Sequence, residues 1–264
     1  MRLAIALLGL WLALSALAPW LPLAPDAVHL ERILAPPALM PGAWLGCDEL
    51  GRPLLDRLLA GAGVSLRVVV LVVMGQALLG VGAGLVGGYV GGVADRLLRA
   101  LTDLTLAFPG LLLALLLAGL LGPGIDNVVI ALVAVGWVGF ARLTRAQVLS
   151  LKHSDHVAAA IALGCGHARI LGRHLLPLLA APLLVEAVLA GAGAITAEAG
   201  LSFLGLGVQP PQASWGGLMR EGARYLLVAP HYLLLPGAAL VAVIHALGVL
   251  GEHLRRRLDP KEKP

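Results

Sequence analysis

The chain has 264 residues, of which 59% are hydrophobic and only 13% are charged, and its mean hydropathy is +0.92. Soluble domains carry about 25% charged residues, so this composition excludes an ordinary water-soluble domain and indicates a protein solvated by lipid. The formal net charge of +4 does not indicate binding to nucleic acid, because the basic residues lie between apolar runs and form no continuous face.

Several apolar runs reach the roughly 20 residues that a helix needs to cross about 30 Å of hydrocarbon. Backbone polar groups in lipid must be satisfied within their own segment. We therefore expect an all-α, polytopic membrane protein with about six transmembrane helices. The expected spans cover residues 3–23, 66–92, 100–121, 126–141, 178–200 and 233–250.

The first span allows two interpretations. Arg2, the apolar run behind it and Ala16-Leu17-Ala18 before Pro19 are typical of a secretory signal with a cleavage site. The apolar character continues through Trp20 and Leu23, which is long for such a signal and favours a retained helix. Under both interpretations the segment that follows lies outside the cell.

The basic residues predict the orientation of the chain. With the N-terminus inside, 13 of the 19 Lys and Arg residues lie on the cytoplasmic side. Cytoplasmic loops carry this excess in membrane proteins, so we expect both termini in the cytoplasm of a cell inner membrane. Residues 24–65 and 201–232 are then external, and residues 142–177 are cytoplasmic. Cys47 and Cys165 fall on opposite sides and cannot form a disulfide with each other.

The second span carries glycines at every fourth position, namely Gly80, Gly84, Gly88 and Gly92. Small residues at this spacing let the backbones of two membrane helices approach closely. The partner helix belongs either to the same chain or to a second subunit, and the pattern alone does not distinguish the two.

The cytoplasmic segment 142–177 is too long for a simple turn and too polar to cross the membrane. Val157, Ala160 and Ile161 recur at helical spacing within it, and Asp155 is placed to cap a helix. We therefore predict a structured helix pair between two spans, which is a surface for a partner.

The stretch from His156 to Gly164, followed by Arg173–Pro177, resembles the "EAA" loop of binding-protein-dependent ABC importer permeases. In that family a short helix of the loop docks in a groove of the ATPase subunit. Gly164 matches the family's glycine, whereas the customary glutamate is replaced by Ala158. The resemblance implies that the ATPase-coupling residues are Asp155, His156, Val157, Ala158, Ala159, Ala160, Leu163, Gly164, Arg173 and Pro177.

Further motifs follow the same order as in the dipeptide, oligopeptide and nickel permease subfamily, of which the chain resembles the second, "C-type", subunit. Cys47 takes a place usually held by Thr. The matching stretches are Trp44–Arg52 with Asp56–Leu59, Glu198–Gly207 with Pro210-Pro211 and Ser214-Trp215-Gly216, and Leu258-Asp259-Pro260.

The resemblance implies a type I importer permease fold with residues 1–65 as an N-terminal helix and external segment. Residues 66–264 then form a permease core of five spans, with the coupling loop at about 142–177. The implied function is ATP-driven import of di- or oligopeptides, with nickel or a metal chelate as the alternative cargo. The implied partners are a second, homologous permease in a heterodimer, two ABC ATPases, an external substrate-binding protein and membrane lipid, but no nucleic acid.

The sequence shows no catalytic constellation. It has no GxxxxGK[ST] loop, so ATP is expected on separate subunits and the chain should hold no cofactor. A membrane enzyme or a structural scaffold remains an alternative of another class, and the coupling loop favours the permease. No metal site is expected. Four of the eight histidines, His153, His156, His167 and His174, lie on the cytoplasmic docking segment, which is the wrong face for capturing an imported metal. His231 and His245 lie near or in the last span, where lone histidines more often form local hydrogen bonds.

Candidate pathway residues lie on the fifth span. An intramembrane carboxylate is costly and is by default functional, which singles out Glu186 and Glu198. Glu198 is expected at the external mouth together with Ser202 and Phe203. Glu186 lies nearer the cytoplasm, where an ion pair with Arg142 or Arg145 would explain it equally well.

Overall fold

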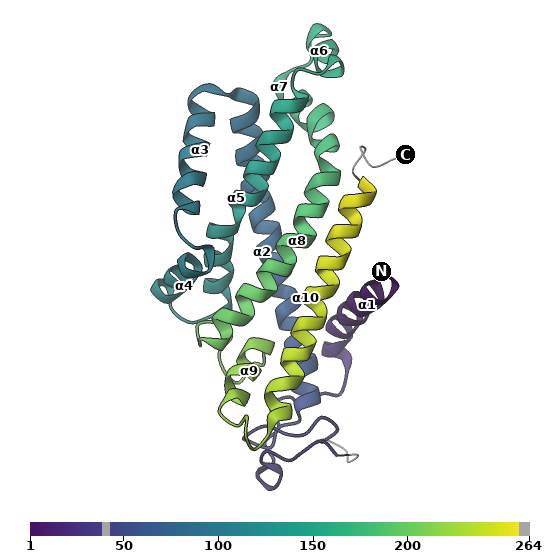
Figure 1. Ribbon diagram of the computed structural model, residues 1–264, viewed down its shortest axis with the longest axis vertical. Coiled ribbons are helices and arrows are strands. Elements are labelled where there is room, and N and C mark those ends of the chain that lie inside the picture. Colours follow the sequence, from purple (N-terminus) through teal and green to yellow (C-terminus); the bar gives the residue numbers. More distant parts are fainter. Residues whose placement is uncertain (39–42, 259–264) are drawn as a thin grey trace.

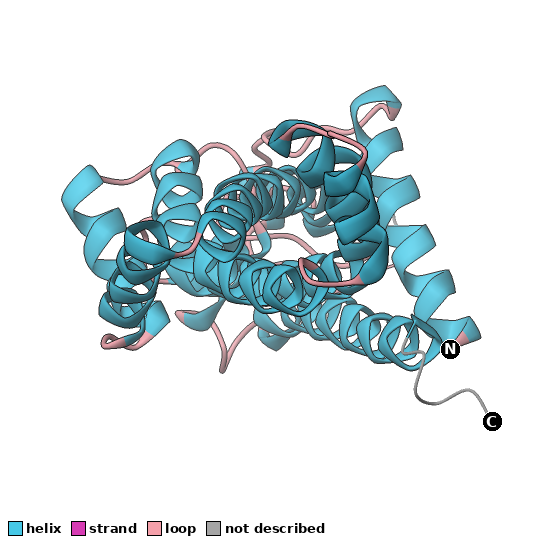
Figure 2. Cartoon of the chain, turned by 90° about the horizontal axis from the view of Figure 1, so that it is seen from above, coloured by secondary structure: helices cyan, strands magenta, loops and turns pink. Residues whose placement is uncertain are grey.

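The computed structural model describes residues 1–38 and 43–258, and within these ranges the chain forms helices and no strands (Figures 1 and 2). Asp259 and Pro260, which belong to the last sequence motif, lie outside these described ranges. The helices are α1 (Arg2–Leu17), α2 (Leu54–Val90), α3 (Gly92–Leu106), α4 (Gly110–Leu121), α5 (Ile125–Leu151), α6 (Asp155–Ala162), α7 (His167–Arg169), α8 (Leu176–Phe203), α9 (Trp215–Ala223) and α10 (Pro230–Leu258).

Five helical runs in the described part are long and apolar enough to cross a membrane, or six if the bent pair α3 and α4 counts as one span. This confirms the expected all-α, multi-pass membrane protein. The five runs are Arg2–Trp20, Leu54–Val90, Ile125–Leu151, His167–Phe203 and Pro230–Leu258.

The expectation of one helix over residues 100–121 is wrong, because the structure divides this stretch between two helices. The chain bends by 87° between α3 and α4, and the break ends at Pro109. Proline lacks the N–H that a helix needs and disfavours helical backbone in the residue before it. Figure 1 shows the consequence: α3 runs along the bundle, whereas α4 lies across it at a steep angle to α3 and packs against α5.

Other helices extend past the expected spans. α2 begins at Leu54. The expected boundary between the N-terminal part and the permease core, at residues 65 and 66, therefore falls inside a continuous helix. The second helix of the expected cytoplasmic pair is continuous with the following span, because α7, a π-helical turn (Ile170–Leu175) and α8 form one run. Hydropathy detects only the part of a helix that lies in hydrocarbon, and these helices continue beyond it.

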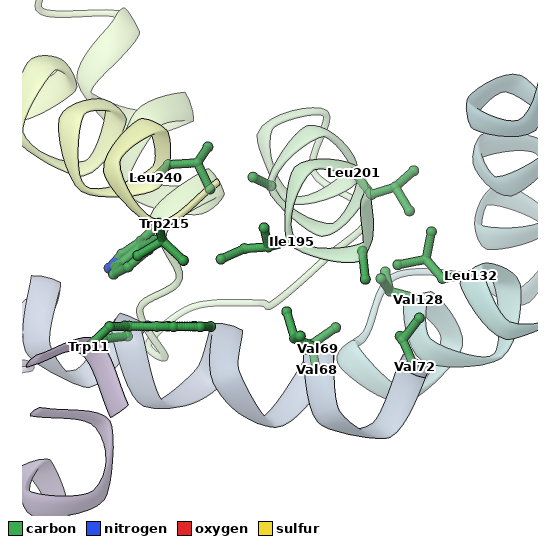
Figure 3. Close-up of a cluster of buried hydrophobic side chains, with 14 of the residues drawn as sticks. Trp11, Val68, Val69, Val72, Val128, Leu132, Ile195, Leu201, Trp215 and Leu240 are labelled. Carbon is green, nitrogen blue, oxygen red and sulfur yellow. The ribbon is translucent and has the colours of Figure 1, made fainter. Parts of the chain in front are cut away.

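The central core lies among α1, α2, α4, α5, α8, α9 and α10 (Figure 3). α1 contributes one face to it, with Ala4, Leu8 and Trp11 buried at helical spacing. The ring of Trp11 lies 6.2 Å, centroid to centroid, from that of Trp215 on α9. The first helix is therefore an integral part of the packed bundle.

Three of the glycines on α2 face α5 within the same chain. A Cβ atom at Gly80 or Gly84 would collide with the α5 backbone, and one at Gly88 would meet Val148. The close packing that this pattern predicted is thus made inside the subunit for these three residues. Gly92 does not belong to the row: it begins α3 with a φ of +57°, and a Cβ there would meet nothing.

Candidate functional site

Helix α6 lies at one extreme of the molecule, between α5 and the run that begins with α7 (Figure 1). Its N-cap is Ser154 and not Asp155, which is the first helical residue, and neither side chain makes a capping hydrogen bond. The expectation that Asp155 caps this helix is therefore wrong. Because only eight residues form α6, its stability must come from packing against its neighbours.

One face of α6 is anchored in a small apolar core. Val157 is fully buried and Ala160 is 4% exposed. Val157 packs in a cluster with Val148 of α5 and Leu179 of α8. α6 therefore shares a core with both flanking helices.

The rest of the α6 surface is largely apolar and exposed. Ala158 and Ala159 are exposed, Ile161 is 54% exposed and Leu163 is 84% exposed. Exposed apolar side chains gathered at the tip of a structure mark an interaction surface. Asp155 and His156 add polar groups at the start of the same helix.

Gly164 ends α6 for a conformational reason. Its φ is +75°, and a Cβ atom there would meet nothing within 4 Å. The left-handed backbone of the turn is what favours glycine here. The remaining coupling residues lie beyond it: Arg173 is exposed in the π-helical turn, and Pro177 occupies the first turn of α8.

Two polar contacts join the docking segment to the end of α2. The Tyr89 hydroxyl lies 2.9 Å from His167 Nδ1, and the two rings meet edge to face. Lys152 Nζ donates to the carbonyl oxygen of Gly88 at 3.1 Å. The sequence gave no signal for these pairs, since their members are 78 and 64 residues apart.

The other end of the bundle carries a buried network of ion pairs. Asp48 is fully buried, and its Oδ2 accepts from Arg52 Nε at 2.6 Å. Arg57, 2% exposed, lies between Asp48 (Nε to Oδ2, 3.4 Å) and Glu221 of α9 (Nη2 to Oε2, 3.2 Å). The network therefore fastens the segment before α2 to α9.

Tyr232 of α10 completes this network. Its hydroxyl lies 2.5 Å from Glu49 Oε2 and 2.7 Å from Glu221 Oε2.

Burial lowers the pKa of Arg52, but the neighbouring carboxylates, Asp48 foremost, outweigh this effect. The pKa is raised on balance, which keeps the guanidinium charged. The motif at 44–59 pointed to this region, whereas its partners Glu221 and Tyr232 carried no sequence signal.

Glu198 is enclosed within the subunit. It is 1% exposed, and its carboxylate accepts hydrogen bonds from Ser202 Oγ at 2.7 Å and Ser65 Oγ at 3.3 Å. Ser202 is buried as well, whereas Phe203 is 40% exposed. In this structure Glu198 and Ser202 join α8 to α2 and do not face an open cavity.

Glu186 has a different environment. It lines a cavity of about 270 Å³ between α2, α4, α5 and α8, together with Gln76. The ion pair with Arg142 or Arg145 that the sequence allowed is not formed. Arg145 instead binds Asp95 of α3 through both Nε and Nη2, and no hydrogen bond or ion pair of Glu186 occurs within the described residues.

Cys47 and Cys165 are not joined by a disulfide, and burial raises the pKa of the Cys47 thiol. In the described part of the chain no group of three or more His, Cys, Asp or Glu side chains is arranged to hold a metal ion.

The comparisons with known proteins agree over most of the chain. Residues 79–264 match the family model described as "Binding-protein-dependent transport system inner membrane component". A dipeptide transport system permease protein of Alkalihalophilus pseudofirmus is 38% identical, over 83% of this chain and 72% of the relative. A nickel transport system permease protein of Escherichia coli K12 is 37% identical, over 98% of this chain and 93% of the relative.

A solved structure shares the fold. A chain of the MetNI methionine ABC transporter, in inward-facing conformations, superposes with a TM-score of 0.63 at 16% identity. The match covers 78% of this chain and 98% of that chain.

Proposed function

Because the chain belongs to the family of binding-protein-dependent transport system inner membrane components, we propose that it is a permease subunit of an ATP-driven importer of di- or oligopeptides. In this role it forms the translocation pathway together with a second permease. It catalyses no reaction itself and holds no cofactor, since ATP is bound and hydrolysed on separate subunits.

The observation that carries this proposal is the construction of α6. On its inner face Val157 lies in the core shared with α5 and α8, and Ala160 is buried as well. Its outer face, with Ile161 and Leu163, is apolar and exposed. A helix with one buried face and an exposed apolar surface can pass the movement of a partner to the helices that it packs against. Coupling to an ATPase requires such a transfer.

The coupling residues support this proposal although the customary glutamate is Ala158. Ala158 is exposed on the outer face, so its small side chain leaves an apolar contact surface in place of a polar contact. We propose that ATPase closure displaces α6, and that α5 and α8 follow it. Rocking of the helices then opens the pathway alternately to either side of the membrane.

The partners follow from the architecture. One chain offers one docking helix, whereas two ATPase subunits need two docking helices. We propose that a second, homologous permease supplies the other helix in a heterodimer, and that an external binding protein delivers the cargo. The α6 end faces the cytoplasm in this scheme, as the excess of basic residues predicts. The face of α2 that carries Gly80, Gly84 and Gly88 is covered by α5, so the heterodimer contact lies elsewhere.

Peptides are the preferred cargo because several relatives, from different organisms, are named for di- or tripeptides or for glutathione, itself a peptide. Nickel or a nickel chelate is the second candidate. It is favoured by one observation, the nickel permease protein of Escherichia coli K12, which matches 98% of this chain.

The test is reconstitution in vesicles with the second permease, the two ATPases and the binding protein. We expect ATP-driven uptake of labelled Ala-Ala that stops when any one component is omitted. Uptake without the second permease would show a homodimer. Uptake of Ni²⁺ and not of Ala-Ala would replace the proposed cargo.

A variant of the outer face tests the docking surface. Leu163→Glu places a charge where an apolar contact with the ATPase is expected, so the ATPases should no longer co-purify with the permeases. The matched control is Leu227→Glu, since Leu227 is 98% exposed and lies before α10 at the opposite end of the bundle. Retention of the ATPases by Leu163→Glu would contradict the docking assignment.

A further inference from the structure

Glu186 and Gln76 reach the same small cavity from two different helices. A Cβ atom at Gly139 of α5 would meet Glu186 Oε1, and one at Gly136 would meet the amide group of Gln76. Positions three residues apart lie on one helix face, about one turn from each other. The two glycines therefore make room for a carboxylate and an amide side by side.

Most of the hydrogen-bonding capacity that remains in this cavity is that of acceptors. Gln76 Nε2 uses one of its two hydrogens on the carbonyl oxygen of Leu132 at 3.0 Å, whereas Gln76 Oε1 has no donor among the described residues. The carboxylate of Glu186 is equally unengaged there. The other lining side chains are apolar, among them Leu111 and Val135. The cavity therefore suits a positively charged ligand that carries several N–H donors.

An ionised carboxylate in a membrane span is costly unless it is paired or faces water, and Arg145, one of the cations considered for it, does not pair with Glu186. Arg145 is taken by Asp95. A metal ion suits the cavity poorly, because hard cations take six or more ligands and the described residues hold no cluster of three metal-binding side chains. A primary ammonium group is compact and has three donors.

The size of the cavity agrees with an end group. Its volume of about 270 Å³ lies just below the range of roughly 300–1,000 Å³ that holds a drug-sized ligand. It therefore accommodates one end of a small peptide and not a long one. We propose that this cavity, with Glu186 and Gln76, is a subsite for a primary ammonium group, the amino terminus of a peptide in transit.

This proposal rests on the proposed function and deepens it, since it favours an amine-bearing cargo over a metal. The cavity is also lined by α5 and α8, the two helices between which α6 is held. Movement of α6 therefore changes the spacing of Glu186 and Gln76, so that the ammonium group is bound in one state of the cycle and released in another.

The experiment measures protection of a thiol placed in the cavity. Gly193 lines it, and a Cβ atom there would meet nothing within 4 Å, so Gly193→Cys fits. The purified complex, without nucleotide, is treated with N-ethylmaleimide, and modification of position 193 is read by mass spectrometry of the peptide that carries it. We expect Ala-Ala to slow the modification and N-acetyl-Ala-Ala, which lacks the ammonium group, to have no effect.

Glu186→Gln in the same background should raise the Ala-Ala concentration for half-protection by about tenfold, since a charge-assisted hydrogen bond is lost. Glu186→Asp keeps the charge and should retain the preference for Ala-Ala over its acetylated form. Equal protection by both peptides, or no effect of Glu186→Gln, would overturn the subsite.

Two further outcomes separate this proposal from the others. Loss of the second permease from the Glu186→Gln complex would show that Glu186 pairs with a cation of that subunit, and the subsite would be refuted. A complex that imports Ala-Ala without protection of position 193 would refute the subsite alone. Protection in a complex that imports no Ala-Ala would refute the proposed cargo and support the subsite.

Discussion

Arg57 shows how a single residue fixes the end of the bundle opposite α6. Its guanidinium contacts Asp48 and Glu221, which are 173 positions apart along the chain. Only 2% of the residue is exposed, so water cannot solvate the guanidinium or the carboxylates that it contacts. A buried pair contributes little net stability, but removal of one partner leaves a buried charge uncompensated.

We therefore expect Arg57→Met to lower the free energy of unfolding by about 3–5 kcal/mol. The segment between α1 and α2 should also be cut faster by an added protease. The measurements are thermal unfolding in detergent and the rate of cleavage within residues 21–53.

The control for Arg57→Met is Arg256→Met. Arg256 and Glu252 form an ion pair at 2.9 Å in which the side chains are 68% and 51% exposed. Such surface pairs contribute about 0–1 kcal/mol, so this variant should unfold close to wild type. Equal losses in the two variants would contradict the role of the buried network.

At the scale of helices, the packing of α2 on α5 depends on the absence of side chains. A Cβ atom at Gly84 would collide with the carbonyl oxygen of Ala141 and with Thr144. Two residues away, a Cβ atom at Gly82 would meet nothing within 4 Å. The two residues are the same amino acid, yet only Gly84 lies where two helices pack closely.

Gly84→Leu should therefore force α2 away from α5 and destabilise the subunit by at least the roughly 1–3 kcal/mol that overpacking costs. Gly82→Leu should leave the unfolding temperature within a few degrees of wild type, as expected for a surface change of about 0.5 kcal/mol. Equal sensitivity at both positions would place Gly82 in a contact between subunits.

At the scale of the whole molecule, the orientation in the membrane can be tested only with introduced cysteines. Cys47 is fully buried, and burial raises the pKa of its thiol. A reagent that attacks the thiolate will therefore react with it slowly, both for lack of access and because little thiolate is present at neutral pH.

Leu163 and Leu227 are better positions, being 84% and 98% exposed and lying toward opposite ends of the bundle. In right-side-out vesicles with Cys165 replaced by serine, a membrane-impermeant maleimide should label Leu227→Cys and not Leu163→Cys. Permeabilised vesicles should allow labelling of both. The reverse pattern in sealed vesicles would invert the proposed topology.

Some features of this protein follow from the sequence because they depend on local chemistry. Hydropathy predicts most of the spans, since a helix is the conformation that satisfies its own backbone in lipid. The helical spacing of Val157 and Ala160 predicts the buried face of α6, although Ile161, predicted on the same face, is 54% exposed. The motif around Gly164 marks the turn that ends the helix.

Other features were decided by tertiary structure, because they depend on which side chains meet across the bundle. Pro109 turns one apolar run into two helices that bend by 87°, which a hydropathy average cannot register. Glu186 and Glu198 look alike in the sequence, as carboxylates twelve residues apart on one helix. Packing gives Glu198 two serine hydroxyls, whereas it leaves Glu186 unpartnered at a cavity, since a helix fixes only the face on which a residue lies and its neighbours decide what that face meets.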